Sequence, residues 1–197
     1  MKIFFIVLLI NLYCLAQQED PIQGLYSQDE NIVIEAINEI ISDSIYQAIP
    51  HLIDLIESEP PFIQMDILRA LSFFRHESAI PHAKRIIESA DELFGTDLML
   101  NPSKARLIAT VVLFNFEDYS TVSYIFELID ISKPSLSRDA IVLLPFVYKK
   151  IPELAERSIS ELFYAYQNSN YDKSLKYFTF SELAELNYDS FRPEIIN

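Results

Sequence analysis

The three histidines are the residues whose type could most directly support metal binding or acid–base chemistry. His51 and His82 each directly follow an Ala-Ile-Pro sequence and lie 31 residues apart. Such equivalent positions can stack in a repeat protein, and two stacked imidazoles could bind a metal ion, but no third ligand has a suitable spacing. His76 falls in a short polar segment between predicted helices. We therefore interpret His51 and His82 as partly exposed polar positions and predict no metal site.

Motifs for nucleophilic or cofactor-dependent catalysis are absent from the sequence. It has no Gly-x-Ser-x-Gly and no His-Glu-x-x-His motif, and its only cysteine is Cys14. Loops that bind phosphate need several glycines, and the chain has only Gly24 and Gly95. Exposed carboxylates at helical spacing usually form a solvated face and not a general-acid pair. The sequence predicts no catalytic residue and no cofactor; the open alternative is an envelope enzyme with an acidic groove that follows no motif.

The elements that would position these residues are helical hairpins that repeat along the chain. Ala48-Ile49-Pro50 returns as Ala79-Ile80-Pro81, and Lys150-Ile151-Pro152 is similar. Apolar residues recur at helical spacing before and after these sequences, which predicts two amphipathic helices per unit. Hydrophobic residues make up 50% of the chain, and this composition favours packed helices over a turn-rich β fold. We predict an all-α fold, an α-solenoid of about four to five hairpins.

The predicted boundaries follow the proline and polar breaks between apolar stretches. A lead-in at residues 17–29 precedes a repeat domain at residues 30–197. An insertion at residues 91–101 separates the second repeat from the third. The predicted repeats are residues 30–58, 61–90, 102–131 and 134–168, followed by a partial capping repeat at residues 171–197.

Three local features are predicted within this pattern. Ser44 and Gln47 have the spacing of a capping box that opens the second helix of the first repeat. Ile49 and Ile80, at the centre of the repeated sequence, are expected to be buried between helices. Pro145 falls inside the first helix of the fourth repeat and is expected to kink it, because proline removes an internal hydrogen bond.

The hairpins with an Ala-Ile-Pro sequence at the start of their second helix resemble the HEAT-repeat family in its short bacterial form. The resemblance covers about residues 29–186 and is strongest in the first two repeats. It implies an α-solenoid used mainly for contacts between proteins, and because the family has no shared catalytic residues, none is expected here. One departure is the Leu-Gly that often ends the first helix of such repeats. The chain has Ile40-Ile41 and Leu71-Ser72 instead.

Charge is unevenly distributed along the chain, whose formal net charge is −14. Residues 17–68 contain eleven acids and no Lys or Arg. Such an acidic chain repels phosphate backbones and anionic membranes, which argues against nucleic-acid binding. The acids serve solubility, the electrostatic steering of a basic partner, or loose calcium binding without a dedicated site. For the second alternative, the candidate partner-binding residues are Glu35, Glu39, Asp54 and Glu57.

Aromatic residues gather near the C-terminal end, between Phe163 and Phe191. Tyrosine-rich surfaces are common at protein interfaces because they provide contact area at low entropic cost. Aromatic packing also shields the end of a repeat core, so the two roles stay open. The candidate partner-binding residues of this end are Tyr164, Tyr166 and Tyr171. We expect a non-enzymatic scaffold that binds an unidentified protein partner through the solenoid surface or this aromatic end.

The N-terminal segment resembles a secretory signal peptide. After a basic start, an apolar run from Ile3 to Leu15 is interrupted only by Asn11, and it is shorter than a membrane span of ~20 residues. Cleavage after Ala16 is predicted, which would release a periplasmic or extracellular protein without a transmembrane segment. Two alternatives stay open: an uncleaved anchor, or a lipoprotein with the same solenoid, anchored at Cys14. A bulky tyrosine directly before this cysteine argues against lipid attachment.

Overall fold

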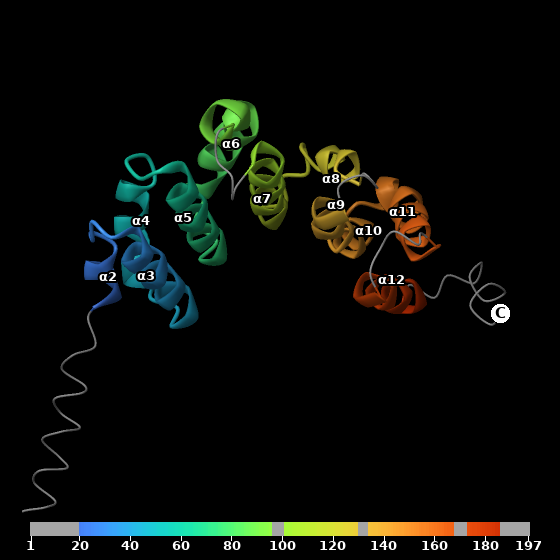
Figure 1. Cartoon of the computed structure of the whole chain (residues 1–197), viewed down its shortest axis with the longest axis horizontal. Coiled ribbons are helices and arrows are strands. Elements are labelled where there is room, and N and C mark those ends of the chain that lie inside the picture. Colours follow the sequence, from blue (N-terminus) through green and yellow to red (C-terminus); the bar gives the residue numbers. More distant parts are fainter. Residues whose placement is uncertain (1–19, 96–100, 130–133, 168–172, 186–197) are drawn as a thin grey trace, which may run out of the picture. The chain divides into compact units, whose positions relative to one another are not determined.

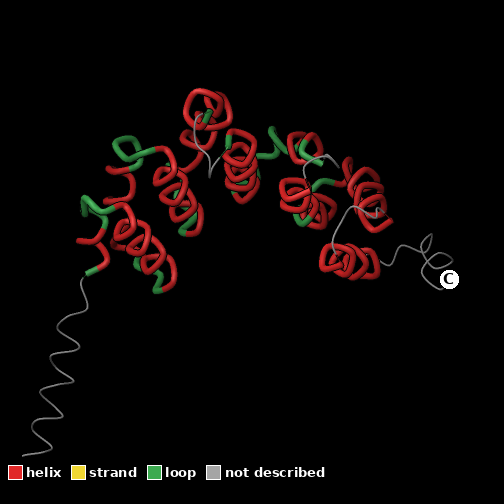
Figure 2. Tube along the Cα trace, in the orientation of Figure 1, coloured by secondary structure: helices red, strands yellow, loops and turns green. Residues whose placement is uncertain are grey.

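Every regular element in the described part of the chain is a helix. The computed structural model describes residues 20–95, 101–129, 134–167 and 173–185 (Figure 1, Figure 2). The prediction of an all-α fold is confirmed for these residues. The predicted signal segment, residues 1–16, lies outside them. None of the helices in the described ranges combines the length and the apolar sequence needed to cross a membrane.

The contacts between residues divide the chain into two units, residues 1–100 and 101–197. The first unit consists of a short helix and two helical hairpins. Its elements are α2 (Pro21–Gly24), α3 (Glu30–Ser42), η1 (Tyr46–Ala48), α4 (Ile49–Leu55), α5 (Pro61–Phe73) and α6 (Ala79–Phe94). The helix α5 lies at the centre of this unit, because it packs against α3, α4 and α6.

The first backbone amides of a helix have no hydrogen-bond partner within the helix. In the first unit, a side chain accepts from such an amide at the start of α3, and a proline without an amide hydrogen stands at the start of α5. The side chain of Asp29 accepts a hydrogen bond from the Asn31 amide at 2.9 Å and caps α3. Pro61 opens α5, at a position where the missing amide hydrogen costs no helical hydrogen bond. The short α2 lies within the predicted lead-in. Its Gly24 lies so close to α3 that a Cβ atom there would be 2.9 Å from the Cβ of Ala36.

One backbone turn recurs in three hairpins, where it follows α3, α5 and α7 (Pro102–Asn115). In each case a residue with positive φ follows the first helix: Ser44 (54°), Arg75 (53°) and Glu117 (61°). The next amide then donates to the carbonyl five residues earlier: Ile45 to Ile40 at 2.9 Å, His76 to Leu71 at 2.9 Å, and Asp118 to Leu113 at 3.0 Å. This is a Schellman motif, in which glycine usually occupies the left-handed position. The chain forms it three times in the described residues without glycine.

This turn corrects the predicted capping box. Ser44 is the left-handed residue of the turn, and η1 starts after Ile45 without a side-chain hydrogen bond at its cap. The Ser-x-x-Gln spacing therefore has no capping function here. Ser44 takes part in the Schellman motif through its backbone and does not cap the following helix with its side chain.

The predicted burial of Ile49 and Ile80 is also wrong by one residue. Both isoleucines are half-buried, whereas the preceding Ala48 and Ala79 are fully buried. The residue that faces the core at the start of each second helix is therefore an alanine, Ala48 or Ala79. A small side chain at this position allows the two helices of a hairpin to approach closely, and the isoleucine that follows keeps part of its surface in solvent.

The second unit contains more and shorter helices. Its elements are α7 (Pro102–Asn115), α8 (Ser123–Glu127), α9 (Pro134–Ile141), α10 (Leu144–Lys150), η2 (Pro152–Leu154), α11 (Ala155–Gln167) and α12 (Lys173–Glu185). The helix α11 packs against both α10 and α12. Fully buried residues of this core include Ile141, Leu144, Val147 and Leu162.

Pro145 has a larger effect than the predicted kink. The helix ends at Ile141 and a new one begins at Leu144, with Pro145 in the first turn of α10. Proline is tolerated there because the amides of a first turn have no helical partner. The predicted first helix of the fourth repeat is therefore two helices, α9 and α10, and the residues of the break are available to line a surface.

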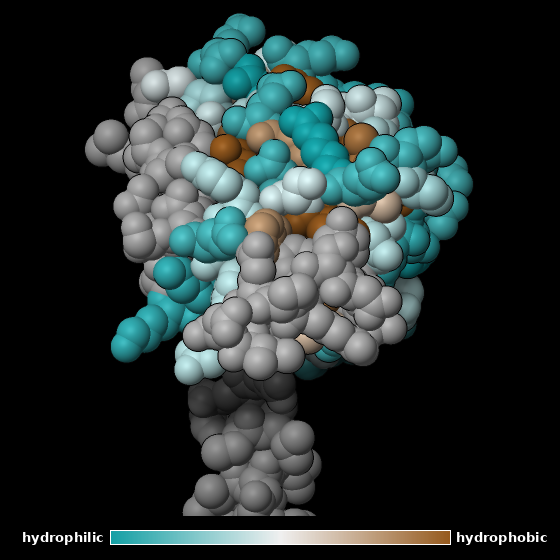
Figure 3. Space-filling model, turned by 90° about the vertical axis from the view of Figure 1, so that its right-hand side faces the viewer, coloured by the Kyte–Doolittle hydropathy of each residue, from teal (hydrophilic) through white to brown (hydrophobic). Residues whose placement is uncertain are grey.

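Several large apolar side chains remain exposed despite these cores. The space-filling view shows apolar surface between hydrophilic side chains (Figure 3). The exposed large apolar residues of the described ranges are Tyr26, Ile32, Tyr46, Phe73, Phe146, Tyr164 and Tyr177. Single exposed apolar residues are common, so the relevant ones are those that border a groove or a second exposed ring.

Replacement of the left-handed turn residues by glycine should stabilise the protein. Ser44 and Arg75 are exposed, and a residue with a Cβ atom is strained at positive φ. We expect Ser44→Gly and Arg75→Gly to raise the free energy of unfolding by about 1 kcal/mol each, measured by urea denaturation followed by circular dichroism. The matched controls Ser44→Ala and Arg75→Ala remove the same side chains but keep the strain. Equal effects of glycine and alanine would contradict the assignment of the turn.

Candidate functional site

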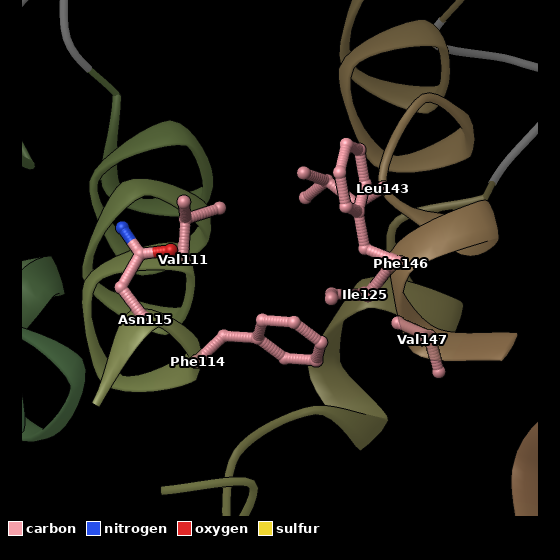
Figure 4. Close-up of a pocket in the computed structure, with 7 residues that line it drawn as sticks. All are labelled: Val111, Phe114, Asn115, Ile125, Leu143, Phe146 and Val147. Carbon is pink, nitrogen blue, oxygen red and sulfur yellow. The ribbon is translucent and has the colours of Figure 1, made fainter. Parts of the chain in front are cut away.

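An apolar groove in the second unit is the candidate functional site (Figure 4). One wall comes from α7, the other from the α9–α10 break and the first turns of α10, and α8 contributes to the lining between them. The cavity has a volume of about 180 Å³. The lining residues are Val111, Phe114, Asn115, Ile125, Leu143, Phe146 and Val147.

The groove forms because α7 and α10 do not pack directly along each other. In the first unit α3 and α5 make extensive contact, whereas α7 contacts α8 but hardly touches α10. The helix α8 spans only Ser123–Glu127, which is too short to fill the space. In Figure 4 the side chains of Val111 and Phe114 lie across an open space from Leu143 and Phe146. The helix break at Pro145 thus places apolar side chains opposite α7.

The lining has a buried floor and an open rim. Ile125 and Val147 are buried in the core, while Phe146 is 59% exposed. Among the described lining residues, Asn115 has the single polar side chain, and none is ionisable. Covering a phenylalanine side chain removes apolar area from water and stabilises by roughly 1.5–3 kcal/mol when the burial is complete. The groove can therefore bind apolar side chains, but it offers no acid or base for catalysis.

Two of the three histidines, His51 and His76, contact side chains nearby in the fold. Tyr26 and His51 form a hydrogen bond of 2.6 Å between the phenol oxygen and Nδ1, and His76 Nδ1 lies 2.8 Å from the Ser78 hydroxyl. His82 is half-buried on α6. Among the described residues, no group of three His, Cys, Asp or Glu side chains could hold a metal ion. The equivalence of His51 and His82 in sequence does not assemble a metal site in this part of the chain.

The surroundings of His82 disfavour its charged form. Burial lowers the pKa of His82 below 6.5, nearby Arg85 lowers it further, and Glu57 acts in the opposite direction. Arg85 is held in place by a hydrogen bond of 2.9 Å from its Nη2 to Gln64 Oε1. Because the neutral imidazole is favoured in the folded protein, protonation of His82 opposes folding.

The predicted acidic residues lie on both helices of the first hairpin. Glu35 and Glu39 are one turn apart on α3, Asp54 is on α4, and Glu57 follows the end of α4. Glu39 is half-buried and the other three are exposed. Their role in steering a basic partner stays a prediction.

The predicted aromatic residues are divided by the structure. Tyr164 of α11 is exposed, whereas Tyr166 is half-buried, with its ring centroid 6.0 Å from that of Phe180 on α12. Tyr171 lies outside the described residues. Tyr164 and Tyr166 are two positions apart on one helix, so they belong to different faces.

The groove itself was missed by the sequence analysis. Its walls come from residues that are far apart in the sequence, and its α10 wall reads as a continuous buried helix, Val142 to Val147. The one available signal was Pro145, which divides this apolar run. Its consequence for the surface required the positions of α7 and α8.

Comparison of the chain with protein-family models, with curated proteins and with solved structures finds no match in any of the three.

The electrostatic surroundings of His82 predict a specific pH dependence. A histidine whose pKa is lowered on folding contributes stability that is present above about pH 6.5 and lost as the pH falls through its folded pKa. We expect the wild-type free energy of unfolding to decrease more than that of His82→Gln between about pH 7.5 and pH 5. Urea denaturation at a series of pH values measures both. Parallel curves for the two proteins would show that burial of His82 has no effect on its protonation.

Proposed function

We propose that this chain is an exported, non-enzymatic scaffold that binds a protein partner, built as a HEAT-like α-solenoid. The observation that carries the proposal is the open apolar groove between α7, α8 and α10, with the exposed ring of Phe146 at its rim. An apolar concavity bordered by an exposed aromatic residue is the kind of surface that protein interfaces use for anchoring side chains.

The recurring turn supports the solenoid part of the proposal. Ser44 and Arg75 occupy the same place in the Schellman motif and are 31 residues apart, which is the period of the Ala-Ile-Pro repeat. The direct packing of α3 on α5 is the arrangement expected of neighbouring hairpins that bury a continuous core. The resemblance to HEAT repeats, in which such hairpins mainly contact other proteins, points in the same direction.

The dimensions of the groove favour a protein partner over a small molecule. Sites for drug-sized ligands are usually about 300–1,000 Å³ and hold several convergent polar groups. This cavity is about 180 Å³, and its lining offers one amide side chain. It therefore suits one or two apolar side chains of a larger partner.

A second exposed aromatic group supports the same class of function. Tyr46 and Phe73 are exposed in the first unit, and both rings contact Phe74, with centroid distances of 5.0 and 5.2 Å. Phe74 is buried, and its ring packs against both exposed rings. Rigid aromatic side chains with open faces bring contact area without a large loss of conformational entropy.

Export predicts a defined N-terminus of the mature protein. If the signal segment is removed after Ala16, mass spectrometry of the protein from its native host should detect a chain that starts at Gln17, including its pyroglutamate form. A lipid-modified Cys14 would contradict cleavage after Ala16 and show that the protein is a lipoprotein. A chain that still begins at Met1 would show that the segment stays uncleaved as an anchor.

Site-specific crosslinking tests whether the groove binds a protein. A photoreactive amino acid in place of Phe146, in the full chain expressed in the native host, should crosslink to one discrete protein. The same amino acid at the exposed Lys104 of α7, away from the groove lining, is the position control. In a second experiment, Val111→Asp should reduce the yield of the Phe146 crosslink by about tenfold, because it places a charge in the apolar contact.

Val111→Thr is the matched control for Val111→Asp, because threonine has nearly the same shape as valine and carries no charge. Circular dichroism spectra and melting curves confirm that both variants are folded. Equal crosslinking at Phe146 and Lys104, or a yield that does not respond to Val111→Asp, would rule out the groove as the binding site.

A further inference from the structure

The helix α12 has a buried apolar face and a second face of lysine and aromatic side chains. Leu175, Thr179 and Leu183 are buried, and they recur at the spacing of one helix face. A second set at the spacing i, i+3, i+4 and i+7 lines an open groove of about 430 Å³ together with Tyr166 of α11. The residues of this second set are Lys173, Lys176, Tyr177 and Phe180. Since α11 covers only one face of α12, this Lys–aromatic groove has no partner in the described part of the chain.

The aromatic rings of the Lys–aromatic groove are open to contact. Tyr177 is 76% exposed, which is more than any other large apolar side chain in the described ranges. Tyr166 and Phe180 lie with their ring centroids 6.0 Å apart and their planes at 37°. Two rings from neighbouring helices and a third at the rim can together accept an apolar side chain.

The charge of the groove is opposite to that of most of the chain. Residues 20–95 contain fourteen Asp and Glu but only four Lys and Arg. In α12, Lys173 and Lys176 precede the first acid, Glu182. Neither lysine forms a side-chain hydrogen bond or an ion pair with another described residue. Two ammonium groups that have no carboxylate partner among the described residues and lie beside open rings favour a ligand that carries carboxylates.

We propose that the Lys–aromatic groove between α11 and α12 binds an acidic peptide segment of a partner protein, in which aromatic or aliphatic side chains alternate with carboxylates. The lysines would pair with the carboxylates, and the rings of Tyr166, Tyr177 and Phe180 would accept the apolar side chains. The inference rests on the proposed function, because both assign protein binding to the chain, but it uses different side chains and specifies the charge of the partner.

The overall charge makes a peptide the favoured occupant over a nucleic acid or a membrane. A chain with a net charge of −14 is repelled by extended phosphate surfaces, which would interact with many of its acids at once. A short peptide segment contacts only the groove, so its carboxylates can pair with the two lysines while few of the chain's acids oppose its binding.

Fluorescence anisotropy with the full chain tests the proposal directly. The probe is a fluorescein-labelled peptide in which glutamate alternates with phenylalanine, and the matched probe has lysine in place of glutamate. The protein should bind the acidic peptide and not the basic one. The variant Lys173→Glu/Lys176→Glu should weaken binding of the acidic peptide at least about tenfold, and higher salt should weaken binding to the wild type.

The control variant Lys104→Glu/Lys149→Glu makes the same change of charge at two exposed lysines of the second unit outside this groove. It should lower the affinity much less. Tyr177→Ala separates the contribution of the rings, since it leaves the charge unchanged and should also weaken binding. Circular dichroism establishes that each variant is folded.

Three outcomes would overturn the proposal. The first is equal loss of affinity in the two charge-reversed variants, and the second is binding of the basic peptide in preference to the acidic one. The third is binding only to phosphatidylglycerol vesicles, or only to a second copy of the chain as seen by sedimentation. Val111→Asp should keep full affinity for the acidic peptide. Peptide binding thus tests the Lys–aromatic groove, and crosslinking at Phe146 tests the other groove, so the two proposals can fail separately.

Discussion

Burial of apolar stripes between neighbouring helices is the interaction on which this structure depends. Isolated helices of the length of α3 or α5 are marginal in water, so their stability comes from tertiary packing. The chain also lacks disulfides to support it, because its one cysteine has no intramolecular partner. In the first unit α5 provides this packing for three other helices. Wherever a helix is shorter or broken, the packing is incomplete, and apolar surface remains open.

The same constraint explains the two grooves of the second unit. The short α8 and the break before α10 leave the groove at Phe146, and the terminal α12 has a face that no described helix covers. Both surfaces are consequences of how the helices end, and neither requires a special motif. This fits a protein whose proposed function is to present surfaces and not to perform a reaction.

The distribution of charge adds a second level of organisation. The first unit is strongly acidic, whereas the Lys–aromatic groove of α11 and α12 carries lysines that have no ionic partner among the described residues. For the acids, the sequence leaves solubility and the steering of a basic partner as alternatives. The groove adds a cationic surface that would prefer an acidic partner, because its lining combines two lysines with the rings of Tyr166, Tyr177 and Phe180.

The sequence by itself determined the all-helical composition, the positions of most helices and much of the core. Apolar periodicity and proline positions carry this information locally, as the buried residues Ile37, Ile67 and Leu71 illustrate. Tertiary structure decided what local patterns leave open. It buried Ala48 in place of Ile49, used Ser44 as a left-handed turn residue, and converted the kink at Pro145 into a break. The grooves belong to the same class, because their walls combine helices whose proximity depends on packing and not on the residues of any one helix.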